Sequence, residues 1–316
     1  MYSGMRMNSS WAWIGSETIG AGTGCETIAG QHLWARPYPL WMWWNLLSLD
    51  APTVVCLWAL CFAQALHISF PFLEISVLTV TVWIIYVSDR MLDVLRTPPG
   101  SALSDRHNFY ARHHYAVLGS LLPITLATAW VSFTKLSSQT RIVGLVLCGA
   151  VLFYFQVIHV FPELAGRWVP KEIIVGAIFA AGAAIPAWTH AAGSEKQLIP
   201  PVLIFAALCG LNCIAIECWE HHRGDRQWKK KPYWLIRLAD ARIVQIAAFL
   251  LVCVGLTGLF GVHATGQADL LWASAFSLSL IAVLDWQSNA LSPQVLRVLA
   301  DAALLTPALF LLKAVL

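Results

Sequence analysis

Two pairs of acidic residues stand where long apolar stretches of the chain give way to charged ones. Asp89 and Asp93 are four residues apart, and Glu217 and Glu220 are three apart. On a helix, either spacing places both carboxylates on one face. Carboxylates that close repel each other unless a cation or a basic partner lies between them. Each pair taken alone also fits a solvated helix end with local ion pairs, because charges are common where membrane helices end.

If the two pairs lie on neighbouring helices, four carboxylates converge on one cavity. Hard oxygen ligands in that number suit Mg²⁺, which keeps several waters and commonly binds phosphates. Arg, Lys and His residues in the adjoining segments suit a diphosphate. Such a site at the mouth of an apolar cavity predicts a polyisoprenyl diphosphate substrate, with the metal neutralising charge as the C–O bond ionises.

These acids belong to a strongly apolar chain. Of its 316 residues, 58% are hydrophobic and 12% are charged, about half of the roughly 25% charged residues of a soluble domain. The mean hydropathy is +0.66, and the 16 Trp residues suit a bilayer interface. This composition excludes a disordered chain, a nucleic-acid-binding domain and a secreted disulfide scaffold. No cysteine pair has metal-binding spacing, so we expect the cysteines to pack as small hydrophobes.

Nine apolar runs are long enough to predict membrane helices. They cover residues 51–68, 71–88, 116–134, 142–161, 171–189, 200–219, 243–262, 268–286 and 295–315. The predicted fold is an all-α integral membrane domain over residues 41–316, with nine transmembrane helices around one central cavity. Residues 1–40 are rich in Gly, Ser and Thr and predict a poorly ordered N-terminal leader.

The two longest polar connections, 89–115 and 220–242, both follow even-numbered helices and therefore lie on the same side of the membrane. With the N-terminus inside, 16 of the 20 Lys and Arg residues fall on cytoplasmic segments. Positive charge favours the cytoplasmic side. We therefore predict that the N-terminus and both long loops are cytoplasmic.

The order of these motifs on nine helices resembles the UbiA superfamily of intramembrane prenyltransferases. The segment DRMLD (89–93) matches the DxxxD half of that family's NDxxDxxxD motif. ECWE (217–220), followed by GDR (224–226), resembles the second motif with Glu in place of its two leading Asp. KEIIVG (171–176), opening the fifth helix, also resembles the family, and the likeness spans about residues 45–316.

The resemblance implies Mg²⁺-dependent transfer of a prenyl group, from a polyisoprenyl diphosphate to an aromatic or other lipophilic acceptor within the lipid bilayer. The enzyme would be a transferase of alkyl groups other than methyl. We predict that Asp89, Asp93, Glu217 and Glu220 are catalytic and that these four, together with Asp225, bind the metal. A second set, predicted to bind the diphosphate, comprises Arg90, Lys171, Asn212 and Arg226.

The chain departs from the family pattern at the leading Asn-Asp of the first motif, which falls on Ile85 and Tyr86. Neither side chain binds a metal as a carboxylate or amide would. A catalytically inert relative with the same fold is therefore one alternative function, and a membrane transporter or lipid-binding protein is another. Asp285 and Asp301 lie close to predicted helix boundaries, so we expect both to reach water.

Overall fold

A computed structural model describes residues 40–69, 71–96, 105–160, 170–191, 193–222, 234–261 and 265–315. No strand occurs among them. The helices are α1 (Leu40–Leu46), α2 (Asp50–Ala65), α3 (Phe72–Arg96), α4 (Asp105–Lys135), α5 (Ser138–Val160), α7 (Lys171–Trp188), η1 (Glu195–Leu198), α8 (Ile199–His222), α9 (Trp234–Ala239), α10 (Ile243–Gly261), α11 (Thr265–Trp286), α12 (Pro293–Ala303) and α13 (Pro307–Val315). The predicted leader lies outside the described residues apart from Leu40.

Eight stretches of the described chain are long and apolar enough to cross a membrane. This confirms a multi-pass, all-α membrane protein. The first predicted span corresponds to α2, an apolar helix of only 16 residues, so a ninth span stays a prediction. The cytoplasmic location of the N-terminus and of the two long loops also stays a prediction.

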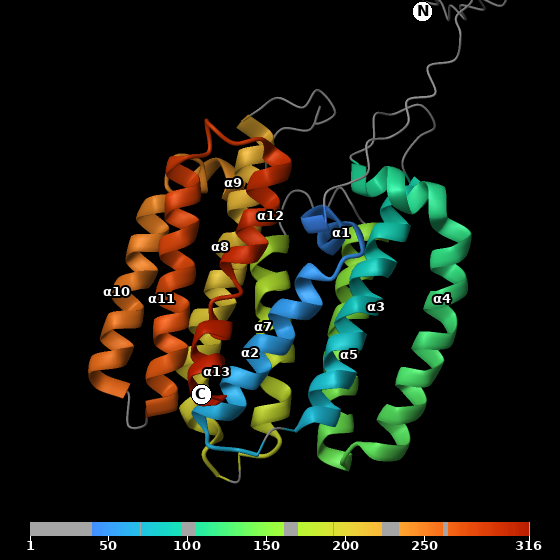
Figure 1. The fold of residues 1–316 in the computed structure, drawn as a ribbon, viewed down its shortest axis with the longest axis horizontal. Coiled ribbons are helices and arrows are strands. Elements are labelled where there is room, and N and C mark those ends of the chain that lie inside the picture. The colour runs from blue at the N-terminus through green and yellow to red at the C-terminus, as the bar shows by residue number, and fades with distance from the viewer. Residues whose placement is uncertain are drawn as a thin grey trace, which may run out of the picture. The chain divides into compact units, whose positions relative to one another are not determined.

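The long helices run up and down beside one another (Figure 1), so that α3, α5 and α8 end where α7 and α12 begin. The closest packing joins α7 to α8: a Cβ added at Gly176 would lie 2.7 Å from the backbone oxygen of Ala206 and the backbone nitrogen of Gly210. Only glycine permits that approach. The lack of a side chain at position 176 therefore fixes the separation of two helices that carry site residues.

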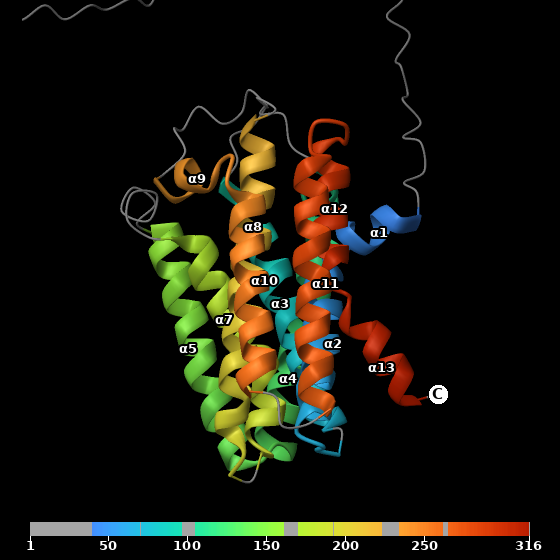
Figure 2. The ribbon, with the colours of Figure 1, turned by 90° about the vertical axis from the view of Figure 1, so that its left-hand side faces the viewer.

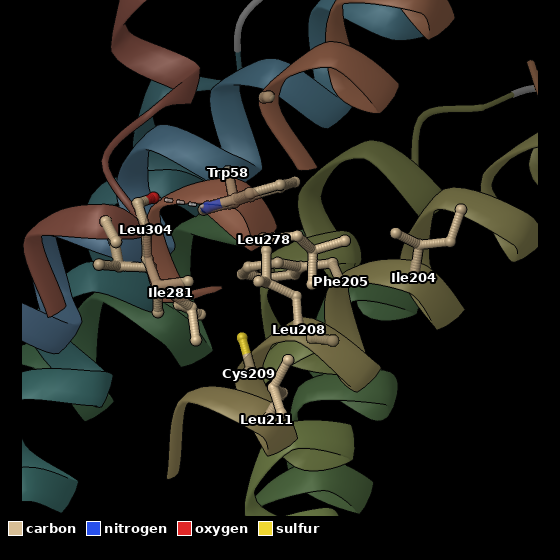
Figure 3. Packing of buried hydrophobic residues seen from close by; sticks show 14 of the residues in the cluster. Trp58, Ile204, Phe205, Leu208, Cys209, Leu211, Leu278, Ile281 and Leu304 are labelled. Carbon is tan, nitrogen blue, oxygen red and sulfur yellow. Dashed lines mark hydrogen bonds between the residues drawn. The ribbon is translucent and has the colours of Figure 1, made fainter. Parts of the chain in front are cut away.

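Aromatic rings fill the core where α2 meets α8. The rings of Trp58 and Phe205 are stacked with centroids 3.9 Å apart, and Phe62 meets Phe205 edge-on at 6.0 Å. Both phenylalanines and the tryptophan are fully buried. Figure 3 shows Trp58 and Phe205 near Leu208 of α8 and Leu278 of α11.

The last predicted span, 295–315, is divided into α12 and α13, because residues 304–306 form a turn. The turn's backbone carbonyl at Leu304 accepts a hydrogen bond of 2.9 Å from Trp58 Nε1, drawn in Figure 3. The hydroxyl groups of Ser277 and Thr306 lie 2.7 Å apart, and Thr306 donates to the carbonyl of Ala273. These bonds satisfy polar groups that an apolar environment would otherwise leave unpaired. Beyond the turn, α13 bends outward from the line of α12 (Figure 2).

The outer helix α4 is irregular at a position that the sequence did not indicate. Prolines at 123, 186 and 307 are the expected places for kinks in helices of this chain. In α4 the backbone departs from helical geometry at His113 (φ −108°, ψ 17°), and not at Pro123. At the same place, His113 Nδ1 lies within hydrogen-bond distance of the backbone carbonyl oxygen of Phe109, at 2.9 Å.

Candidate functional site

A cavity of about 200 Å³ lies between α2, α3, α7, α8 and α12. Its polar lining consists of Asp50, Tyr86, Arg90, Asn212, Arg297 and Asp301. Its remaining lining is largely apolar and includes Val54, Val175, Phe179, Ile216 and Leu304. The cavity therefore combines charged groups of both signs with an apolar wall, an arrangement suited to a ligand with a polar head and a hydrocarbon body.

Two polar atoms of the lining residues have no hydrogen-bond partner among the described residues. They are Nε of Arg90 and Oδ1 of Asn212, and both are buried. The Asn212 residue is only 4% exposed, and its amide nitrogen donates to Asp301 Oδ1 at 3.4 Å. Unpaired buried polar atoms cost about 1–3 kcal/mol each. Both atoms belong to residues that line the cavity, so a polar group bound there could complete their hydrogen bonds.

Arg90 lies between the two predicted acids of α3. Its Nη1 atom is 3.7 Å from Asp89 Oδ2 and 3.8 Å from Asp93 Oδ2. The arginine side chain is 18% exposed, whereas the two aspartates are 34% and 39% exposed. Tyr86 and Arg90, one helical turn apart, both line the cavity. The two aspartates are on the same helix but do not line the cavity.

The second predicted pair also has basic partners. Glu217 Oε2 is 3.3 Å from Lys171 Nζ, which is 3.7 Å from Oε1 of the buried Glu172. Glu220 forms an ion pair with Arg297, and Arg297 in turn lines the cavity. These pairs have a common cause: a carboxylate in an apolar environment is costly unless a cation neutralises it.

The four carboxylates therefore do not line the cavity, and each has a basic side chain within 4 Å. In the described part of the chain, no three His, Cys, Asp or Glu side chains come close enough together to hold a metal ion. The four acids that were expected to converge therefore do not form one shared metal site among the described residues. Of the predicted site residues, Arg90 and Asn212 line the cavity, while Asp225 and Arg226 lie outside the described residues.

Three charged residues of the cavity lining were not predicted as site residues from the sequence. Asp50 opens α2 and accepts hydrogen bonds of 3.0 Å from Asn45 Nδ2 and from the backbone of Ala51. Arg297 and Asp301 are one turn apart on α12 and both line the cavity, and the expected contact of Asp301 with water stays a prediction. The missed signal was an i, i+4 pair of opposite charges inside an apolar run.

The site is thus an amphipathic cavity between apolar helices, and two of its charged lining residues, Arg90 and Arg297, form ion pairs with acids outside the lining. The chain matches no family model, and no curated protein or solved structure is significantly similar to it. Its resemblance to the UbiA superfamily therefore depends on the motif residues themselves.

Proposed function

We propose that this protein is an intramembrane prenyltransferase of the UbiA type. It would transfer a prenyl group from a polyisoprenyl diphosphate to an aromatic or other lipophilic acceptor. The observation that carries the proposal is the amphipathic cavity, whose lining joins an apolar wall to Arg90, a residue with a buried and unpaired Nε atom. A guanidinium with a free N–H is suited to a phosphate oxygen.

Different parts of the lining would bind the diphosphate head and the hydrocarbon tail of the substrate. Arg90 and Arg297 supply positive charge for the diphosphate, while Val54, Phe179 and Leu304 contact the hydrocarbon next to it. Tyr86 lines the same space, at the position where the family has an acid, and its ring is available to an allylic cation. In this arrangement the protein's own side chains orient the C–O bond between a charged and an apolar wall.

Mg²⁺ fits this proposal as a shared ion, bound partly by the protein and partly by the substrate. Mg²⁺ is commonly held by one or two carboxylates together with substrate phosphates and waters. Asp89 and Asp93 are two carboxylates within 4 Å of one arginine that lines the cavity. When bound there, the ion would neutralise charge on the leaving diphosphate. Glu217 and Glu220 remain further candidates through their ion pairs with Lys171 and Arg297.

Diphosphate release tests the proposal. The purified protein in lipid nanodiscs is incubated with Mg²⁺ and with geranyl, farnesyl or geranylgeranyl diphosphate, and released diphosphate is measured with and without phenolic acceptors. Asp93→Ala is expected to lower release about 100-fold, as removal of one electrostatic stabiliser does elsewhere. Glu74→Gln is the matched control, because Glu74 lies at the opposite end of α3 and contacts His190. Equal release by wild type and Asp93→Ala would contradict the proposal.

The inert relative is distinguished by restoring the family residues. The double variant Ile85→Asn, Tyr86→Asp supplies the two missing first-motif ligands. A gain in Mg²⁺ affinity, together with diphosphate release that wild type lacks, would identify the natural chain as an inert relative. Release by wild type itself excludes that alternative.

A transport function is favoured by one observation, the turn that divides α12 from α13. Interrupted helices near the middle of a membrane are typical of transporter binding sites. Here, however, Trp58 and Thr306 bond to carbonyls of Leu304 and Ala273 beside the interruption. Ion- or proton-coupled flux into vesicles without any prenylated product would support transport instead.

A further inference from the structure

The lining of the cavity is charged at one end and apolar at the other. On α12, the lining residues Arg297 and Asp301 are followed by Leu304 at the end of the helix. On α2, the lining residue Asp50 is followed one turn later by Val54. A substrate with a diphosphate head therefore has its head among the charged residues and its hydrocarbon directed toward the apolar end.

Three aromatic rings lie together at the apolar end, and we call Phe179, Phe205 and Trp58 the aromatic floor. Phe179 lines the cavity, and its ring centroid is 6.1 Å from that of Phe205. Phe205 is stacked on Trp58 at 3.9 Å, and both residues are fully buried. The Trp58 indole donates to the backbone carbonyl of the lining residue Leu304 (Figure 3). Rings packed this closely and bonded to the backbone have little freedom to move aside.

The space above this floor is small. Ile216 and Cys209 are lining residues of α8 that lie seven positions apart, which corresponds to about 10 Å along a helix. The cavity volume of about 200 Å³ is below the roughly 300–1,000 Å³ of pockets that enclose a drug-sized ligand. Part of this volume belongs to the diphosphate. The remainder suits a hydrocarbon of about one or two isoprene units, because an extended unit is roughly as long as one helical turn.

We propose that the aromatic floor sets an upper limit to the length of the prenyl group, and that Phe179 is the residue that determines it. This inference rests on the proposed prenyl transfer, and it identifies the donor as dimethylallyl or geranyl diphosphate in preference to longer polyisoprenyl diphosphates. Of the three rings of the floor, only that of Phe179 lines the cavity. A longer hydrocarbon would have to displace this ring against Phe205, which Trp58 holds in place.

Binding of slowly reacting substrate analogues tests the limit without requiring turnover. The thiolo analogues of geranyl and farnesyl diphosphate, in which sulfur replaces the bridging oxygen, are titrated into the protein in lipid nanodiscs. Longer chains partition more strongly into lipid, so the affinity of a variant is compared with that of wild type for the same analogue. Phe179→Ala is expected to bind the farnesyl analogue about tenfold more tightly than wild type, and the geranyl analogue within about threefold of wild type. No change, or an equal change for both analogues, would overturn the proposal.

Two further variants keep the test decisive. Phe249→Ala is the matched control, because this ring of α10 is 66% exposed and lies outside the cavity lining; both analogues should bind it as they bind wild type. If Phe179→Ala does not fold, Phe179→Leu replaces it, because leucine removes less of the side chain. That variant is expected to bind the farnesyl analogue about threefold more tightly than wild type. Wild-type affinity for the farnesyl analogue in folded Phe179→Leu would overturn the proposal equally.

The outcomes separate this inference from the function on which it rests. Wild type is expected to release diphosphate faster from geranyl than from farnesyl diphosphate, and Phe179→Ala is expected to lose that order. Analogue binding whose length preference depends on Phe179, in a protein that releases no diphosphate, would reject prenyl transfer and leave a diphosphate site of limited depth. Equal release from both chain lengths, in wild type and in Phe179→Ala alike, would reject the limit set by the aromatic floor and leave the prenyltransferase.

Discussion

Helices α4 and α8 are both long and apolar, but they occupy opposite environments. Of the most apolar stretch of α8, 56% is buried inside the protein, against 0% for α4. In α4, Leu122, Leu126 and Trp130 are all more than 60% exposed, and Figure 1 shows this helix outermost, beyond α3. Apolar content therefore indicates that a segment enters the membrane, without indicating whether protein or lipid covers it.

The difference follows from what drives helix packing in a bilayer. Lipid tails are as apolar as leucine, so burial of a leucine against protein brings little hydrophobic gain, and close packing decides instead. The buried pair α7–α8 has Gly176 and Gly210 at its contact. Helix α4 instead exposes large apolar side chains, among them Leu118, Leu122 and Phe133, and its Gly119 approaches no neighbouring helix within 4 Å. Small residues at a close helix contact thus distinguish the buried pair α7–α8 from the outer helix α4.

The largest expected effect is at the α7–α8 contact. Gly176→Leu would force a side chain into backbone atoms 2.7 Å away. We therefore expect the free energy of unfolding to fall by at least about 4 kcal/mol, or no folded protein to form. Thermal unfolding in lipid–detergent micelles measures this change in stability. Gly149→Leu on α5, where a Cβ meets nothing within 4 Å, is the control and should leave stability nearly unchanged.

A smaller loss is expected in the aromatic core. Phe205→Ala removes a fully buried ring that stacks on Trp58, and the cavity left behind should cost about 3 kcal/mol. Phe153→Ala on α5 removes a ring that is 72% exposed. Equal losses for the two variants in a denaturant titration would break the distinction between inner and outer helices.

The hydrogen bond from Trp58 to the α12–α13 turn should contribute less to stability than the buried ring of Phe205. Trp58→Phe keeps a ring in place but removes the donor to the Leu304 carbonyl, at an expected cost of about 1–2 kcal/mol. The comparison is Trp272→Phe, at a side chain on α11 that is 60% exposed. A stability change in Trp272→Phe as large as in Trp58→Phe would contradict the assignment.

The smallest effect is expected on α4 itself. The double variant Leu122→Ala, Leu126→Ala removes two side chains that are 65% and 62% exposed, so the change in unfolding free energy should stay below about 0.5 kcal/mol. A loss of about 2 kcal/mol or more would show that another protein surface covers this face of α4. The environment of α4 would then no longer differ from that of α8.

The helices could be predicted from the sequence because apolar runs of membrane length are separated by charged segments. Their ends could not: α3 continues to Arg96, beyond the expected 88, and α4 begins at Asp105 in place of 116. A helix does not stop at the membrane boundary, where hydropathy changes, because its backbone bonds persist in water. The turn in the last span depends on Trp58, a residue far away in sequence, and no local pattern indicates it.

Only the part of the site on α3 and α8 could be predicted from the sequence. The DRMLD motif directs attention to Arg90 and its acids, and the apolar surroundings of Asn212 mark it as unusual. The participation of Asp50 and Arg297 depends on which helices become neighbours, and tertiary packing sets that. Glu217 and Glu220 were predicted as metal ligands from their spacing and motif, and that role stays a prediction. Their ion pairs with Lys171 and Arg297 could not be predicted, because those partners lie on other helices.

The Trp58–Leu304 bond also bears on biosynthesis. Its two residues are separated by 246 positions, which a ribosome translating about 5–20 residues per second needs on the order of 10–50 s to cross. During that time the indole N–H of α2 lacks its native acceptor, so α2 cannot make this contact until residue 304 has been synthesised. Closure of this side of the bundle therefore waits for α12 and the turn that follows it.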